Sequence, residues 1–211
     1  MKNRVYTEKD AEDFLKRYLP IAKNKLTQNI EQAQKFTKKY PVVLKIISKD
    51  ALHKTEVKGV RIINNKQELE REYKALESIA IKKKIKLDGI LIQEYVKGQE
   101  VIIGIKKDPT FNHVIMFGTG GTMVEILKDV QFRHCPITED DAEDMINQLK
   151  LKQLLTGFRN EKPVNLKLLK QLLVKASKIP LKYSNIEELD INPLIINSKD
   201  AKVADARIVF S

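Results

Sequence analysis

The sequence has very little cysteine and no long apolar run. Its single cysteine, Cys135, cannot form an internal disulfide, so a reducing cytoplasm is the simplest location. No apolar stretch approaches the roughly 20 residues that a membrane-spanning helix needs. The N-terminal residues MKNRVYTEKDAEDFLKRY also lack an apolar signal core. We therefore expect a cytoplasmic protein with no export signal and no membrane segment.

Two familiar nucleotide-binding motifs are also missing. The glycine-rich stretch GTGGTMVE (118–125) matches neither the dinucleotide fingerprint GxGxxG nor a phosphate loop that ends in GK[ST]. Its glycines permit close backbone approach to a ligand, but a tight hairpin turn explains them equally well. His113 and His134 have no ligand-like spacing to each other or to Cys135, so we predict neither a zinc site nor a cysteine nucleophile.

Charge is plentiful and mostly positive. Charged residues make up 32% of the chain and hydrophobic residues 42%, as in globular proteins. Lys and Arg exceed Asp and Glu by 39 − 28 = 11. This surplus suits nucleic acid, an acidic partner or a phosphorylated ligand. The lysines are, however, scattered over predicted helices, which favours an ordinary solvated surface.

Hydrophobic periodicity predicts a mixed α/β chain with two lobes, residues 1–93 and 94–211, joined near 94–97. Helices are predicted to begin at Thr7 and at Thr27. The remaining predicted helices are 66–84, 138–155 and 163–179, and the predicted strands are 41–47, 60–63, 88–96, 100–108, 112–121, 122–127, 186–196 and 202–210.

The last two strands are predicted to form an antiparallel hairpin around the turn NSKDA. Asp190 and Asn192 share one face because side chains alternate along a strand. Asp205 then pairs close to Asn192 and Pro193. Two carboxylates and one amide suit Mg²⁺, which keeps several waters and relies on substrate phosphates. The alternative is that Asn192 caps a bulge before Pro193 and that Asp205 faces solvent.

Other candidate residues are individually ambiguous. Lys45, inside the apolar run PVVLKII, either extends to water at a sheet edge or holds an anion such as a nucleotide phosphate. The segment QEYVKGQE (93–100) either offers backbone groups to an adenine and carboxylates to a ribose, or is an ordinary strand with solvated acids. His53, in the loop ALHKTEVKG, is either a phosphoryl acceptor or an exposed loop residue.

Five sequence blocks occur in an order typical of one enzyme family. They are PVVLKIISKDALHKTEVKGV, LIQEYVKGQEVIIGIKKDPTF, VIMFGTGGTMVEILKDVQFR, LLTGFRNEKPVNL, and ELDINPLI followed by VADARI. Together they resemble the ATP-grasp β subunit of ADP-forming (NDP-forming) acyl-CoA synthetases, which include archaeal acetyl-CoA synthetases and are related to succinyl-CoA synthetase. The resemblance covers nearly the whole chain. It implies an ATP-grasp fold with nucleotide in the crevice between two lobes.

The resemblance implies a role for particular residues of the N-terminal lobe and of the junction. Lys45 matches the strand lysine that contacts nucleotide phosphates, and His53 matches a loop histidine that serves as a second phosphoryl carrier. Glu94, Tyr95 and Val96 match the hinge that holds the base. In the C-terminal lobe, the implied residues are Glu100 on the nucleotide-facing strand, Asn192 and Asp205 as Mg²⁺ ligands, and Asp190 as an acid near the metal and the phosphohistidine.

The implied reaction is acyl-CoA + ADP + phosphate ⇌ carboxylic acid + CoA + ATP. In the family, an acyl phosphate forms on a partner α subunit, and its phosphoryl group reaches ADP through an α-subunit histidine and the β-subunit histidine. The chain is therefore expected to be an acid–thiol ligase subunit that needs an α subunit, in a heterotetramer. One departure is Lys58, because the family usually has two glycines before the valine that corresponds to Val60.

Two alternatives remain open from the sequence. One is another ATP-grasp carboxylate ligase that forms an acyl phosphate directly at the nucleotide and has no need of His53. The other is a basic nucleic-acid-binding module without enzymatic activity, which salt-sensitive DNA binding unaffected by Mg-ATP would favour. The resemblance favours the synthetase subunit, with ATP or ADP and Mg²⁺ bound and with neither nucleic acid nor membrane as a partner.

Overall fold

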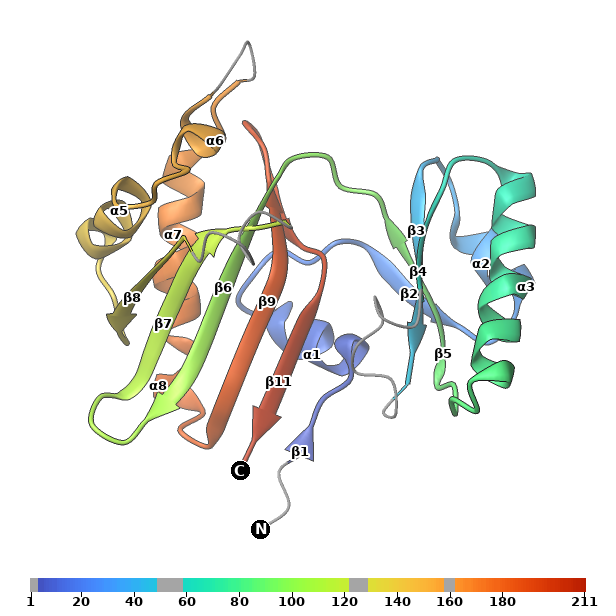
Figure 1. Cartoon of the computed structure of the whole chain (residues 1–211), viewed down its shortest axis with the longest axis horizontal. Helices are drawn as coiled ribbons and strands as arrows, with labels where there is room; N and C mark the ends of the chain where they lie inside the picture. Colours follow the sequence, from blue (N-terminus) through green and yellow to red (C-terminus); the bar gives the residue numbers. More distant parts are fainter. Residues whose placement is uncertain (1–3, 49–58, 122–128, 158–161) are drawn as a thin grey trace. The chain divides into compact units, whose positions relative to one another are not determined.

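The computed structural model describes residues 4–48, 59–121, 129–157 and 162–211 (Figure 1). Its internal contacts divide the chain into two compact units. Unit 1 comprises Met1–Tyr6, Asp10–Ile21 and Val96–Ser211, and unit 2 comprises Thr7–Lys9 and Ala22–Tyr95.

The observed division differs from the predicted lobes 1–93 and 94–211 mainly at the N-terminus. Most of the first 21 residues belong to unit 1, with the C-terminal part of the chain. The physical reason is long-range pairing and burial. Strand β1 (Arg4–Val5) pairs antiparallel with β11 (Ala206–Phe210), and Ala11, Leu15 and Leu19 are buried in the core of unit 1. Local periodicity cannot reveal such pairing.

Unit 1 is built on an antiparallel sheet. Its described strands run in the order β1-β11-β9-β6-β7-β8, and β10 also pairs with β9. The bounds of the strands not yet given are β6 Gln99–Asp108, β7 Asn112–Thr119, β8 Val130–His134, β9 Ile186–Ile196 and β10 Ala201–Val203. The strand predicted at 122–127 lies outside the described residues. β8 was not predicted, because VQFRH has neither a continuous apolar run nor a buried side chain at every second position.

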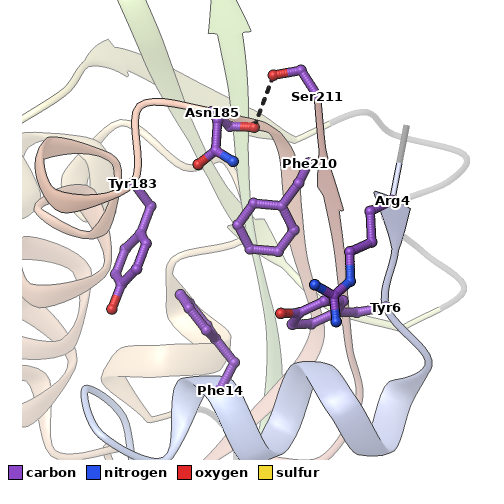
Figure 2. A pocket seen from close by; sticks show the side chains of 7 residues that line it. All are labelled: Arg4, Tyr6, Phe14, Tyr183, Asn185, Phe210 and Ser211. Atoms are coloured by element: carbon purple, nitrogen blue, oxygen red, sulfur yellow. Dashed lines mark hydrogen bonds between the residues drawn. The ribbon is translucent and has the colours of Figure 1, made fainter. Parts of the chain in front are cut away.

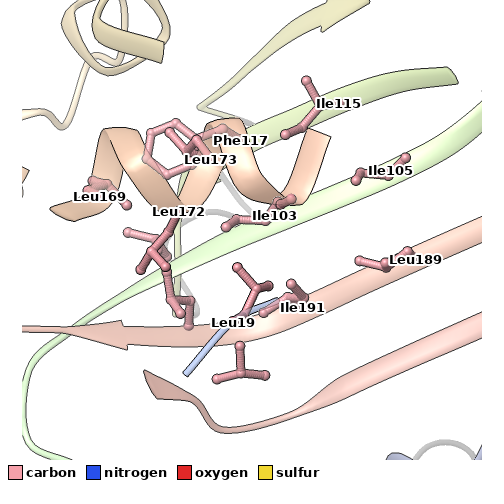
Figure 3. Packing of buried hydrophobic residues seen from close by; sticks show 14 of the residues in the cluster. Leu19, Ile103, Ile105, Ile115, Phe117, Leu169, Leu172, Leu173, Leu189 and Ile191 are labelled. Carbon is pink, nitrogen blue, oxygen red and sulfur yellow. The ribbon is translucent and has the colours of Figure 1, made fainter. Parts of the chain in front are cut away.

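Helices supply the other half of the core of unit 1. The described helices are α1 Glu8–Leu15, whose first two residues belong to unit 2, α5 Glu139–Asn147, α6 Gln153–Thr156, α7 Leu166–Ser177 and α8 Ile179–Lys182. Leu169, Leu172 and Leu173 of α7 pack over Ile103 of β6 and Phe117 of β7 (Figure 3). Buried and more exposed side chains alternate along β6 and β9, because successive side chains of a strand point to opposite faces of the sheet. The face away from the helices therefore carries the polar residues.

The helix predicted at 138–155 is broken into α5 and α6. It begins as predicted at Thr138, whose side chain forms a capping box with Asp141. The break follows from a contact distant in sequence. The buried carboxylate of Asp129 accepts hydrogen bonds from the backbone N–H groups of Lys150 (2.9 Å) and Leu151 (2.8 Å). Because these donors bind the carboxylate instead of helical carbonyls, the helix ends before them.

Unit 2 is a smaller sheet covered by two helices. Its strands run in the order β2-β5-β3-β4 and are antiparallel. Their bounds are β2 Asn24–Thr27, β3 Val42–Ile47, β4 Val60–Ile63 and β5 Gly89–Glu94, and the helices are α2 Ile30–Phe36 and α3 Lys66–Lys82. Figure 1 shows α2 and α3 on one side of this sheet, where Leu69, Tyr73 and Leu76 pack with Leu44 and Ile46.

The prediction that a helix begins at Thr27 is wrong. Thr27 is fully buried in β2, where its hydroxyl donates to the carbonyl of Ile90 at 2.6 Å and lies 3.2 Å from the Tyr73 hydroxyl. The helix begins two residues later, because the side chain of Asn29 accepts the backbone N–H of Gln32 as an N-cap. Threonine is favourable both at a helix N-cap and in a strand. Here the hydrogen bonds and burial of Thr27 in β2 favour the strand.

Candidate functional site

The C-terminal hairpin brings Asn192 and Asp205 opposite each other, as the sequence predicted. The backbone N–H of Asn192 donates to the carbonyl of Asp205 at 3.1 Å, and that of Ala204 donates to the carbonyl of Pro193 at 2.9 Å. On either side of this point β9 pairs with β10 and β11. Asn192 is exposed and Asp205 half-buried, while Ile191 is fully buried. The polar side chains therefore leave the sheet on the face away from the core.

Asp190 lies on the same face as Asn192 and is electrostatically strained. The pKa of the Asp190 carboxyl is raised to about 6, chiefly by burial and secondarily by the neighbouring charges of Glu188 and Asp205, while Arg207 acts in the opposite direction. A cation bound beside these carboxylates would offset their repulsion and favour the ionised form of Asp190. The donor set therefore fits a hard divalent ion, with carboxylate and amide oxygens as ligands. Within the described ranges, no group of three or more His, Cys, Asp or Glu side chains is placed to hold a metal.

We expect Asp190→Asn to stabilise the metal-free protein at pH 8 but not at pH 4. The folded-state pKa of about 6 lies above the ordinary 3.8, so folding disfavours the ionised carboxyl. The resulting loss in the free energy of unfolding is absent below pH 4, grows between pH 4 and 6, and is complete above pH 7. At about 1.4 kcal/mol per pKa unit, this loss reaches at most about 3 kcal/mol. Urea unfolding in EDTA across this pH range measures the free energy of unfolding of both proteins.

The matched control for this experiment is Asp144→Asn, which removes an exposed carboxylate on α5. We expect the control to leave the pH dependence of the free energy of unfolding unchanged. A gain for Asp190→Asn that is equal at pH 4 and pH 8 contradicts the electrostatic account.

Lys45 lies on a central strand and is largely shielded from water. It is 6% exposed, and its ammonium donates to Oε1 of Glu8 at 2.8 Å. Because Leu44 and Ile46 point into the core under α2 and α3, Lys45 points to the other face of the sheet. The alternative that this lysine extends to solvent at a sheet edge is therefore excluded, because β3 has β5 and β4 on its two sides.

The residues predicted to hold a base and ribose lie at the end of β5 and the start of β6. Glu94 is tied to Lys23 by two hydrogen bonds of 2.8 Å, one from its backbone N–H and one to its carboxylate Oε1. Tyr95 is 43% exposed and Val96 is half-buried. The boundary between the two units falls between Tyr95 and Val96, so this extended segment links them covalently.

Glu100 lies against the glycines that precede the undescribed residues 122–128. The backbone N–H of Gly120 donates to the carbonyl of Glu100 at 2.6 Å. A side chain at position 120 would place its Cβ 2.7 Å from Cβ of Glu100, so only glycine fits. Gly121 has a φ of +85°. Close packing therefore requires glycine at position 120, and the positive φ favours glycine at position 121. Residues 122–125 lie outside the described part of the chain, so the choice between a ligand-binding segment and a tight hairpin turn stays open.

The three histidines and the cysteine have different surroundings. His53 lies outside the described residues, as do 122–125 of the glycine-rich stretch. His113 is buried, with Nε2 2.8 Å from the carbonyl of Ile186, and His134 stacks against Phe111. Burial raises the pKa of the Cys135 thiol to about 12. Such a thiol stays protonated and is not a nucleophile at neutral pH.

A separate aromatic cavity of about 370 Å³ lies where the chain ends meet (Figure 2). The guanidinium of Arg4 is 5.0 Å from the ring centre of Tyr6, and the hydroxyl of Ser211 donates to the carbonyl of Asn185. None of the predicted site residues lines it; its lining residues are Arg4, Tyr6, Phe14, Tyr183, Asn185, Phe210 and Ser211.

Sequence reasoning missed two buried carboxylates. Glu8 binds the ammonium of Lys45, and Asp129 binds the backbone between α5 and α6. Glu8 looked like an ordinary acid in the first turn of a helix, and Asp129 like a loop residue. No local signal distinguishes them, because their partners are 37 and more than 20 residues away.

Both units are of mixed helix and sheet content, with Lys45 on the smaller sheet and the Asn192–Asp205 hairpin on the larger, and this architecture is that of an ATP-grasp domain. The sequence model of the ATP-grasp domain family matches residues 1–210, and the chain belongs to this family. More particularly, it is a homologue of the β subunits of ADP-forming acetate–CoA ligases, the acid–thiol ligases that the sequence predicted. The fold class is confirmed as well.

Curated relatives support this assignment over nearly the whole chain. The chain is 40% identical to subunit beta of acetate–CoA ligase [ADP-forming] I of Pyrococcus furiosus, covering 99% of this chain and 93% of that subunit. It is also 40% identical to 4-hydroxybutyrate–CoA ligase [ADP-forming] of Nitrosopumilus maritimus, over 95% of this chain but only 30% of that longer protein.

Solved structures agree. The dinucleotide-forming acetyl-coenzyme A synthetase 1 of Ca. Korarchaeum cryptofilum, in complex with coenzyme A and Ca-AMPCP, superposes with a TM-score of 0.94 and 37% identity, over 99% of this chain and 94% of that one. Another structure of that protein, with Mg-AMPPCP and its phosphohistidine segment pointing towards the nucleotide-binding site, gives a TM-score of 0.83 with 37% identity, over 97% of this chain and 92% of that one.

Proposed function

We propose that this chain is the nucleotide-binding β subunit of an ADP-forming acyl-CoA synthetase. It makes ATP from ADP with a phosphoryl group that a partner α subunit obtains from acyl-CoA and phosphate. The observation that carries the proposal is the 40% identity to a β subunit of which the chain covers 93%. The same observation favours this activity over a ligase that forms an acyl phosphate directly at the nucleotide.

The experiment that tests the activity is reconstitution. The chain is co-expressed with α subunits of the family and assayed for ATP formation from acetyl-CoA, ADP and phosphate. Activity that needs both chains and releases CoA supports the proposal. Hydrolysis of ATP by the chain alone with a carboxylic acid and an amine would instead point to the direct ligase.

Asn192 and Asp205 are proposed to hold Mg²⁺, with Asp190 beside them. When bound, the ion supplies positive charge that offsets the oxyanions of the nucleotide phosphates. The hairpin register, with the Asn192 N–H bonded to the Asp205 carbonyl at 3.1 Å, supports this role. The raised pKa of Asp190 supports it too, since this carboxyl is ionised most easily beside a cation.

Lys45 is proposed to contact the nucleotide phosphates, and Glu94, Tyr95, Val96 and Glu100 to hold the base and ribose. The proposed role of these residues is to bind and orient the nucleotide. Phosphoryl transfer depends chiefly on such positioning and on charge neutralisation. Lys45 supplies a point charge. The backbone N–H and C=O groups of the extended segment at Tyr95 and Val96 are proposed to bind the edge of a planar base.

His53 is proposed to carry the phosphoryl group from the partner to ADP. One imidazole nitrogen of His53 attacks the phosphorus of the phosphohistidine on the partner α subunit, whose N–P bond breaks and leaves that imidazole free. The new N–P bond on His53 then breaks as a terminal phosphate oxygen of ADP attacks the phosphorus. The products are ATP and the free imidazole, so no further reactant is needed. His53 and Lys45 lie eight residues apart in sequence, on a strand and the segment that follows it. This spacing suits a carrier that reaches the phosphate site.

The proposed assembly is a heterotetramer of two such chains and two α subunits in the cytoplasm. The β-subunit names of the relatives imply an α partner, and the single cysteine suits a reducing compartment. Among the helices that the structure describes, none combines the length and the apolar character required to cross a membrane. The names of the relatives give acetate and 4-hydroxybutyrate as substrates, and we propose that the acyl group is selected by the partner subunit.

We expect Asp205→Asn to raise the Mg²⁺ concentration needed for half-maximal nucleotide binding about tenfold. The change keeps the shape of the side chain but removes one of the charges that attract the ion. Calorimetric titration of Mg²⁺ into the chain with ADP measures this. Asp200→Asn, at the exposed turn after β9, is the control. An unaltered metal requirement for Asp205→Asn would support the solvated-carboxylate alternative.

A further inference from the structure

Glu8 forms a buried ion pair with the lysine proposed to contact phosphates. The two side chains are 1% and 7% exposed, and Nζ of Lys45 lies 2.8 Å from Oε1 of Glu8. Glu8 is the first residue of α1, so the positive end of the helix dipole favours its ionised form. Both residues belong to unit 2, although they are 37 positions apart in sequence.

The residues that pair directly with Lys45 in its sheet are apolar. Lys45 is paired with Val60 on β4 and with Leu91 on β5, and neither of these supplies a charge. A buried ammonium group carries a cost of leaving water, and an anion at hydrogen-bonding distance offsets that cost. Glu8 supplies that anion at hydrogen-bonding distance.

We propose that Glu8 is a positioning residue that keeps Lys45 charged and holds its ammonium ready for the nucleotide phosphates. The inference rests on the proposed function, because it takes the phosphate role of Lys45 as given. Glu8 itself touches no substrate. Its carboxylate limits the rotamers of the lysine, so less conformational entropy is lost when a phosphate binds.

Glu8 has two opposing effects on nucleotide affinity. Its negative charge repels a phosphate, but it also stabilises the cation that attracts the phosphate. The carboxylate touches the ammonium, whereas a phosphate bound to that ammonium lies farther from the carboxylate. The attraction between Glu8 and Lys45 is present both before and after a phosphate binds, so it adds no affinity by itself. Glu8 favours binding by holding the ammonium charged and in place beforehand, and we expect this gain to exceed the repulsion, which acts over the longer distance from carboxylate to phosphate. Loss of Glu8 therefore weakens nucleotide binding.

The test is a double-mutant cycle on the full chain with Mg-ADP as the probe, measured by competition against a fluorescent ADP analogue. The variants are Glu8→Gln, Lys45→Met and the double variant. We expect Kd to rise about tenfold in Glu8→Gln and about tenfold to a hundredfold in Lys45→Met, typical of losing a charged hydrogen bond. The double variant is expected to bind as Lys45→Met does, because Glu8 acts only through the lysine.

A merely structural Glu8 would lower affinity by the same factor with or without Lys45, and that result overturns the proposal. Unchanged or tighter binding by Glu8→Gln, with Lys45→Met impaired, overturns the positioning role and leaves the proposed function intact. Unchanged binding by Lys45→Met overturns the phosphate role of Lys45 and the inference with it.

Two further variants complete the design. Asp13→Asn neutralises an exposed acid on the same helix, paired with Lys16, and is expected to leave Kd unchanged. Glu8→Asp keeps the charge but withdraws it by one carbon, so its Kd is expected to lie between those of the wild type and Glu8→Gln. If Glu8→Gln does not fold, Glu8→Asp decides alone: a wild-type Kd overturns the proposal, and an increase of about threefold supports it.

Discussion

His53→Ala is expected to abolish ATP formation with the α subunit, by at least about a thousandfold, because it removes the nucleophile that carries the phosphoryl group. Affinity for ADP is expected to stay within about twofold of the wild type, since Lys45 and the hairpin remain. The measurements are coupled ATP synthesis from acetyl-CoA, ADP and phosphate, and calorimetric titration of Mg-ADP. A phosphorylated protein band from labelled ATP should disappear as well.

His134→Ala is the matched control, because His134 is an exposed histidine on β8 that stacks on Phe111. It is expected to retain full turnover and labelling. Full activity in His53→Ala would remove the relay and favour a ligase that forms its acyl phosphate at the nucleotide. Loss of ADP binding together with turnover would show instead that the segment around residue 53 shapes the nucleotide site.

Lys45→Met is expected to raise the Kd for Mg-ADP by about tenfold to a hundredfold, corresponding to about 1.5–3 kcal/mol for a hydrogen bond to a charged group. Methionine is unbranched like lysine, so packing against Leu91 and Val60 changes little. The variant also leaves Glu8 buried without its ammonium, and we expect a lower free energy of unfolding for that reason. Thermal melts separate this effect from the affinity.

The control for Lys45→Met is Lys25→Met, an exposed lysine on β2 of the same sheet. It removes the same charge from unit 2 and is expected to leave Kd unchanged at 150 mM salt, since exposed charges are screened. Equal affinity of Lys45→Met and wild type contradicts the phosphate role of Lys45. Equal losses in both variants would indicate only a general effect of net charge.

Much of the candidate site followed from local sequence. Alternation along LDINPL predicted that Asp190 and Asn192 share a face, and the short polar turn predicted that Asp205 pairs near Asn192. The hydrogen bond from Asn192 N–H to the Asp205 carbonyl agrees with that register. A hairpin is predictable because its pairing partners are neighbours in sequence, so the length of the turn sets the register.

Other features did not follow from local sequence. Thr27 was assigned to a helix that in fact begins after Asn29, because a buried strand partner in β5 outweighs its capping preference. The helix predicted at 138–155 ends where Asp129 binds the backbone of residues 150 and 151. In both cases a group more than 20 residues away competes with the local pattern and supplies the stronger hydrogen bonds.

By itself, the sequence determined most of the elements, their mixed α/β character, the pairing of the C-terminal hairpin and the family to which the chain is related. Only the tertiary structure decided that the N-terminal strand joins unit 1 and that Lys45 is held by Glu8. The reason is the distance in sequence between the residues that interact. Periodicity and capping depend on residues within one or two turns, whereas strand order and buried ion pairs depend on which distant segments pack together as apolar surface leaves water.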